Sequence, residues 1–230
     1  MYYKRRLCLS SGRNTAFFTD LRLSEETGFR VRVSTSDDFR CTAILTGTPS
    51  DGTEKKSAAR AVGIILGQYL SGRKRVLAAG IGNAAVTPDS LGPRCIEHLI
   101  PSPDTTPSLF TLTPGVPAKT GMDTASLVRC AAGIVCSDCI LTIDALAAQS
   151  EESLASVIQI TDQGTSPGSG IGNSESSLIC TGTMGIPVIS VGVPTVMENG
   201  RLLVTPADCD RIADTFSQIL ALGIINALFR

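Results

Sequence analysis

The chain has 230 residues, of which 43% are hydrophobic, and it carries 20 basic against 21 acidic side chains. That length and apolar content support a substantial buried core. The near-neutral charge gives no overall field that would favour nucleic acid or an anionic membrane as a partner. Most of the eight cysteines lie inside apolar runs, so we interpret them as reduced thiols of a cytoplasmic protein with neither a secretion signal nor a membrane span.

The first 40 residues are polar and predict an N-terminal arm with edge strands such as 29–33. Helical and strand-like apolar patterns then alternate over residues 41–230, which we interpret as one domain. The predicted elements are a helix over 54–72, a strand over 75–80, a short helix from Pro93, a strand over 109–112, a helix from Asp123 or Thr124 to about Val135, strands over 139–143, 157–161 and 187–191, and a final helix capped by Thr205 with Pro206 at its first position. This order indicates an α/β fold, a three-layer α/β/α domain with a mostly parallel sheet.

Two aspartates, Asp89 and Asp144, each come downstream of a predicted buried strand. In open α/β sheets ligands bind outside the carboxyl ends of the strands, so paired acids there form a candidate acid–base pair. Asp162 follows a third strand, and we expect it at the same edge, where it would tune or replace one partner. The alternative is structural: Asp89 would cap a turn and Asp144 would start a helix.

Polar loop residues extend this candidate site. The segment 164–173 is rich in Gly, Ser and Asn, and loops of this kind form sites at strand ends. We predict that Asn83, Asp162, Ser169 and Asn173 bind substrate. Backbone N–H groups of residues 168–173 would steady a developing oxyanion.

Two glycine motifs are weaker indications of function. Residues 80–85 match the G-x-G-x-x-A form of a dinucleotide-binding loop, but Pro88 interrupts the helix that should open there, so a tight turn is favoured. Residues 164–168 match G-x-S-x-G, but Pro167 lacks the backbone N–H that an oxyanion hole would use. We therefore expect no bound cofactor.

Cysteine and histidine spacing offers one more alternative. Cys136 and Cys139, with Cys95 and His98, have the spacing of zinc ligands. Their apolar surroundings favour small buried side chains instead, and we expect no metal. The zinc site and a catalytic cysteine near His98 both stay open as alternatives.

Several segments occur in a recognisable order: Gly82-Asn83, 87–93, 114–116, Thr120-Gly121, 143–148, 167–173 and 192–196, with Thr19-Asp20-Leu21 before them and 203–206 after them. Together they resemble the signature blocks of the germination protease family, spore endopeptidases that degrade small acid-soluble spore proteins. The likeness runs nearly from end to end of the chain.

The resemblance implies an atypical aspartate-dependent endopeptidase with a core akin to that of hydrogenase maturation proteases. The family's two essential aspartates fall on Asp89 and Asp144. It further implies a homo-oligomer, tetrameric by resemblance, located in the forespore or spore core. A zymogen that removes a short N-terminal segment, within residues 1–40, is also implied, with small acid-soluble spore proteins as substrates.

Some positions depart from the family pattern. Gln149 replaces the usual arginine, Asp123 stands where the family tends to have glutamate, and Ala84-Ala85 replaces bulkier or polar residues. The segment before the final helix is reduced to residues 197–203. These departures favour, as an alternative, a catalytically inactive relative that binds spore proteins or serves as a structural partner. A nucleotide-binding oxidoreductase is the third hypothesis.

Overall fold

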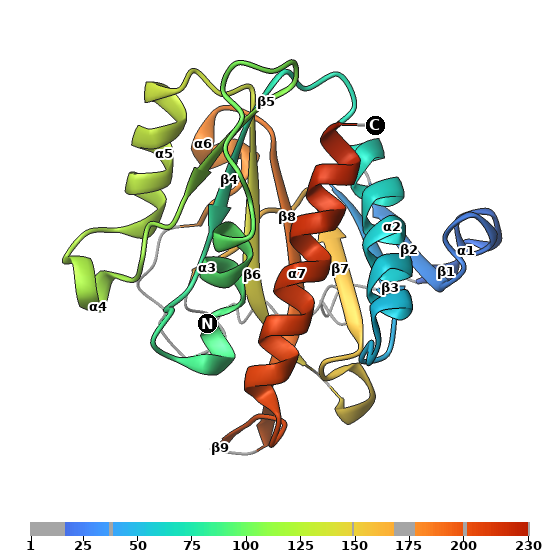
Figure 1. The fold of residues 1–230 in the computed structure, drawn as a ribbon. Helices are drawn as coiled ribbons and strands as arrows, with labels where there is room; N and C mark the ends of the chain where they lie inside the picture. The colour runs from blue at the N-terminus through green and yellow to red at the C-terminus, as the bar shows by residue number, and fades with distance from the viewer. Residues whose placement is uncertain (1–16, 37–38, 149, 168–177, 200–201, 230) are drawn as a thin grey trace.

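The computed structural model describes residues 17–36, 39–148, 150–167, 178–199 and 202–229. Within these residues a nine-stranded sheet runs through the molecule in the order β1-β2-β3-β7-β8-β6-β4-β5, with β9 paired to β8 (Figure 1). The strands are β1 (Phe18–Thr19), β2 (Arg30–Ser36), β3 (Phe39–Leu45), β4 (Arg75–Gly80), β5 (Ser108–Leu112), β6 (Cys139–Ala148), β7 (Val157–Thr161), β8 (Val188–Asn199) and β9 (Leu202–Val204).

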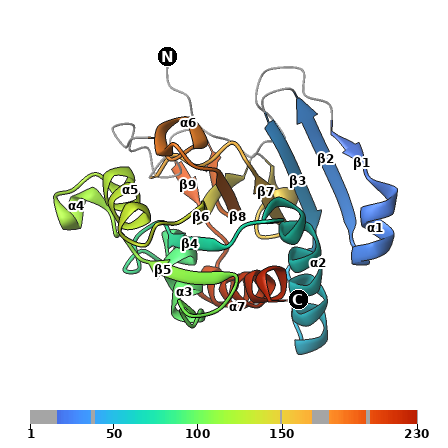
Figure 2. The same cartoon turned by 90° about the horizontal axis from the view of Figure 1, so that it is seen from above.

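Helices cover both faces of this sheet (Figures 1 and 2). On one face lie α2 (Gly52–Tyr69), α3 (Leu91–Glu97) and α7 (Cys209–Leu228), and on the other lie α5 (Thr124–Ile134) and α6 (Thr181–Met184). The remaining helical segments are α1 (Leu21–Thr27), α4 (Pro117–Thr120) and the 3-10 turns η2 (Thr87–Asp89) and η3 (Glu151–Ser153). The predicted three-layer α/β/α fold is confirmed. No helix in the described part of the chain combines the length and apolar character needed to cross a bilayer.

The central strands β5, β4, β6 and β8 are parallel, as predicted, and antiparallel strands flank them. β7 pairs antiparallel with both β3 and β8. The expectation that β7 ends at the same edge as β4 and β6 is therefore wrong. Residues 149–156, which join β6 to β7, are too few for the crossover helix that a parallel return needs.

Alternating side chains of the strands supply two apolar layers. Val76 and Ala78 of β4 face α2, α3 and α7, whereas Leu77 and Ala79 face α5. In the first layer α2 and α7 approach so closely that a Cβ on Gly223 would lie 2.5 Å from Val62 Cγ1. The glycine thus sets the distance between these two helices.

Two boundaries and one helix cap differ from the sequence prediction. β6 continues through Ala148 because β8 pairs with it as far as Met197, so Asp144 lies inside a strand and neither follows one nor starts a helix. The last helix begins at Cys209 and not near Thr205. Asp208 occupies its N-cap position, but its carboxylate pairs with Arg211 and makes no capping hydrogen bond.

Candidate active site

The turn after β4 holds Asp89 through the backbone. The chain turns at Gly82, whose φ is 120°, and returns along η2. The N–H of Asn83 donates to Asp89 Oδ2 at 2.8 Å and also to the Asp89 carbonyl at 3.0 Å. A Cβ on Gly82 would overlap that carbonyl oxygen. A residue without a side chain is therefore needed for Asp89 to sit where it does.

Asp144 lies in β6, level with Gly192 of β8. Its side chain is on the same face as Ile140, which packs in the layer under α5. The hydroxyl of Thr165 donates to Asp144 Oδ2 at 2.7 Å. A Cβ on Gly192 would lie 2.6 Å from the Asp144 carbonyl oxygen, so this stretch of β8 also approaches through its backbone alone.

Main-chain contacts bring the two acids to the same end of the parallel strands. The N–H of Ile81 donates to the Ile143 carbonyl at 2.8 Å, one residue before Asp144. Gly92, at the start of α3, rests on this junction, because a Cβ there would lie 2.5 Å from the Ile143 carbonyl oxygen. Thr195 of β8 donates its hydroxyl to the Pro88 carbonyl at 2.5 Å. The segment that carries Asp89 is thereby attached to β4, β6 and β8.

The two carboxyl groups are buried and electrostatically coupled. Asp89 is 7% exposed and Asp144 is 5% exposed. Burial raises the pKa of Asp89 to about 6, opposed by the Asn83 N–H. Burial also raises the pKa of Asp144 to about 7, and the charge of Asp89 adds to the rise, while the Thr165 hydroxyl and the Ala145 N–H oppose it. Near neutral pH such a pair can hold one proton between two acids, which is the state that acid–base chemistry requires.

The other predicted site residues have different positions and contacts. Asn83 is next to Asp89, but its side chain accepts a hydrogen bond from the Ala85 N–H at 3.1 Å. Asp162 accepts a 2.7 Å bond from the Arg40 N–H and is held against β3, so it is not brought to the pair. The antiparallel direction of β7 explains this placement. Ser169 and Asn173, like the whole segment 168–173, lie outside the described residues.

The cysteine, histidine and glycine motifs lie in different environments. Cys95 and Cys139 are buried in the apolar layer under α3 and α7, whereas Cys136 and His98 are exposed. Within the described residues, no three His, Cys, Asp or Glu side chains come together as metal ligands would. Gly82 is used to accommodate Asp89, and α3 opens only at Leu91. The sequence contained no comparable signal for Thr165, whose contact with Asp144 depends on the path of the chain after β7.

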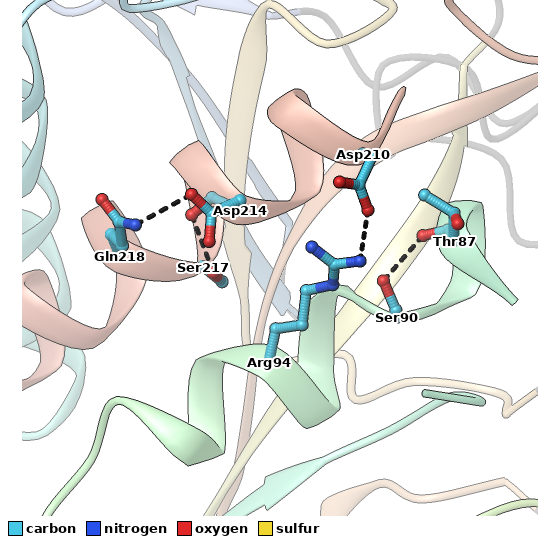
Figure 3. Close-up of polar contacts among 7 residues, drawn as sticks. All are labelled: Thr87, Ser90, Arg94, Asp210, Asp214, Ser217 and Gln218. Atoms are coloured by element: carbon cyan, nitrogen blue, oxygen red, sulfur yellow. Dashed lines mark hydrogen bonds and ion pairs between the residues drawn. The ribbon is translucent and has the colours of Figure 1, made fainter. Parts of the chain in front are cut away.

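Polar contacts also connect α3, which follows Asp89, to α7 (Figure 3). Arg94 of α3 pairs with Asp210 of α7 at 2.5 Å, and the Ser90 hydroxyl donates to the Thr87 carbonyl at 2.8 Å. The ion pair is solvent-exposed on the Asp210 side, so it contributes at most about 1 kcal/mol.

Comparison with known proteins identifies the family. The family model described as germination protease matches residues 50–201. The chain belongs to the germination protease family. It is 40% identical over 134 residues to the germination protease of Caldanaerobacter subterraneus subsp. tengcongensis, covering 54% of this chain and 41% of that protein. With the protein of Clostridium acetobutylicum the identity is 33% over 225 residues, covering 72% of this chain and 68% of the relative.

The match to several family members is partial. The germination protease of Bacillus subtilis (strain 168) is 39% identical over 137 residues, which cover 53% of this chain and 36% of that protein. The chain thus spans about two fifths of the length of the first relatives it matches. Among solved structures, a NiFe hydrogenase maturation protease from Thermococcus kodakarensis KOD1 aligns with a TM-score of 0.40 at 18% identity, over 68% of this chain and 98% of that one.

Proposed function

We propose that this family member is an endopeptidase that degrades small acid-soluble spore proteins during germination, and that Asp89 and Asp144 jointly activate the attacking water. The observation that carries the proposal is the coupling of two buried carboxyl groups, whose pKa values burial raises to about 6 and about 7. Membership of the germination protease family supports the substrate class.

The proposed reaction uses one ionised and one protonated acid. The ionised carboxylate takes a proton from water as the water oxygen bonds to the scissile carbonyl carbon. The protonated partner gives its proton to the carbonyl oxygen. In the collapse of the tetrahedral gem-diol intermediate, the proton held by the pair passes to the leaving nitrogen as the C–N bond breaks, and a hydroxyl proton of the intermediate returns to the other carboxylate as the carbonyl of the new carboxylic acid forms. The pair finishes with one shared proton, as it began.

The test is cleavage of a purified small acid-soluble spore protein, followed by mass spectrometry of the fragments. We expect cleavage by the wild-type protein and none by Asp89→Asn or Asp144→Asn, with all variants folded by circular dichroism. Asp104→Asn, at an exposed loop position, is the matched control and should cleave normally. Full activity in either pair variant would rule out the aspartate mechanism.

A second candidate is a non-catalytic family member that binds spore proteins or serves as their structural partner. Two departures from the family pattern favour it: Gln149 in place of the usual arginine, and the short segment 197–203 before the last helix. This function predicts that the wild-type protein leaves the spore protein intact in the cleavage experiment. It also predicts that the wild-type protein retains the spore protein in a pull-down.

The family also suggests how the protein is made and assembled. We extend the proposal to a cytoplasmic homo-oligomer of the forespore or spore core, tetrameric in the family pattern, that loses a short N-terminal segment. Light scattering coupled to size-exclusion chromatography would measure the mass of the assembly. N-terminal sequencing of protein from sporulating cells would locate a processed end.

A further inference from the structure

Thr165, which follows β7 in the chain, contacts Asp144 of the candidate pair through its hydroxyl. We propose that Thr165 is a positioning residue, whose hydroxyl holds Oδ2 of Asp144 and leaves Oδ1 to exchange protons with Asp89 and the attacking water. This inference rests on the proposed function and deepens it. It concerns how one acid is oriented and which of its oxygens reacts.

The backbone of Thr165 is held through both its N–H and its carbonyl group. Its N–H donates to the Ile179 carbonyl at 2.8 Å, and the Ile179 N–H donates back to the Thr165 carbonyl at 2.9 Å. The preceding Gly164 has a φ of 83°, and a Cβ there would overlap the Ile179 carbonyl oxygen. The side chain of Thr165 therefore starts from a defined point, and its β-branched χ1 has few alternatives.

The acceptor of this buried hydroxyl is a carboxylate. Thr27, which is also buried, donates to the Leu23 carbonyl at 2.7 Å in the usual manner of a helical threonine. Thr165 is 5% exposed and donates to a carboxylate instead. Hydrogen bonds to an ionised acceptor are stronger than those to a neutral one, and they fix the orientation of the carboxyl plane.

The charges around Asp144 make this hydroxyl consequential. Asp89 is the one charged group in the described chain that raises the pKa of Asp144, and only the Ala145 N–H joins Thr165 in opposing the rise. The carboxylate of Asp162 is bonded to the Arg40 N–H instead. Without the Thr165 hydroxyl, the ionised form of Asp144 loses a donor in a buried setting, so its pKa should rise by about one unit.

The test compares Thr165→Val, which is nearly isosteric, with Thr165→Ser, which restores a hydroxyl, and with Thr27→Val, which removes a buried hydroxyl elsewhere. Two readouts are measured: kcat and KM for a small acid-soluble spore protein across pH, and titration of Asp144 by NMR with 13C-labelled aspartate. For Thr165→Val we expect kcat to fall about tenfold at unchanged KM. The alkaline limb of the profile, which follows the higher of the two pKa values, should move up by about one pH unit, and so should the Asp144 titration. Thr165→Ser should return both, and Thr27→Val should change neither.

The outcomes separate this inference from the proposed function. If the wild-type protein leaves the spore protein intact, the proposed function fails, while the NMR titration still decides whether Thr165 controls Asp144. If Asp144 titrates identically in wild type, Thr165→Val and Thr165→Ser, the inference is overturned even where cleavage is observed. Should Thr165→Val lose its fold, Thr165→Ala takes its place under the same criteria.

Discussion

The charge of Asp89 acts on Asp144 and raises the pKa of its carboxyl group. The coupling exists because the segment that leads from β4 to Asp89 is hydrogen-bonded to β6, the strand that carries Asp144, through Ile81 and Ile143. The two groups therefore titrate as a pair, and their shared behaviour should be visible in stability as well as in catalysis.

The first prediction concerns the pH dependence of stability. Both folded pKa values, about 6 and about 7, lie above the ordinary 3.8, so the folded state holds these protons more tightly than the unfolded state. The free energy of unfolding should then fall as pH rises from about 4 to about 7, and level off above that range. Asp144→Asn removes one such group, and its free energy of unfolding should exceed that of wild type by about 4 kcal/mol at pH 8.

Urea unfolding at several pH values measures this difference. The advantage of Asp144→Asn should vanish below about pH 3, where the wild-type carboxyl is protonated in both the folded and the unfolded state. Asp104→Asn, at an exposed site, should track the wild-type curve. A constant offset between Asp144→Asn and wild type at all pH values would contradict the assigned cause.

The second prediction tests the backbone approach at Gly82. Replacing Gly82 with alanine places a Cβ against the Asp89 carbonyl oxygen at a φ of 120°, so the turn must move. We expect a loss of about 2–3 kcal/mol in the free energy of unfolding. The Asp89 carboxyl should also lose the Asn83 N–H as a partner.

Gly72→Ala is the control for this change. Gly72 also has a positive φ, of 76°, but no atom lies within 4 Å of the added Cβ. Its cost should be limited to backbone strain of about 1 kcal/mol. Equal losses at the two glycines would show that conformation alone, and not the contact with Asp89, makes Gly82 necessary.

The third prediction concerns the contact between α2 and α7. Gly223→Ala inserts a methyl group 2.5 Å from Val62 Cγ1, which forces the helices apart, and we expect a cost of about 1–3 kcal/mol. Gly133→Ala, in α5, meets no atom within 4 Å and should stabilise the protein by about 0.5 kcal/mol through helix propensity. Thermal unfolding of the two variants should move in opposite directions.

Much of the fold was predictable because its signals are local. The apolar run 75–80 coincides with β4, and α5 begins after Asp123, whose carboxylate accepts from the Ser126 N–H. These elements depend on periodicity and capping within a few residues. The direction of β7 and the length of β6 depend on partner strands distant in sequence, and no local pattern reports them.

The candidate site was also predictable only in part from the sequence. Asp89 and Asp144 were identified from their place after apolar runs and from the family blocks, and the structure brings their charges together. Their catalytic role stays a prediction. The prediction that Asp162 lies at the same strand end is wrong because β7 runs antiparallel to β8. Thr165 was missed because its contact spans two segments that only the folded chain brings together.

Glycines surround the acid pair at Gly82, Gly92 and Gly192, and at each of them an added methyl group would strike main-chain atoms. The positions of the two aspartates are consequently fixed by peptide planes and not by how large side chains fit together. Substitutions of large side chains in the two apolar layers should then leave the aspartates in place as long as these three glycines are kept.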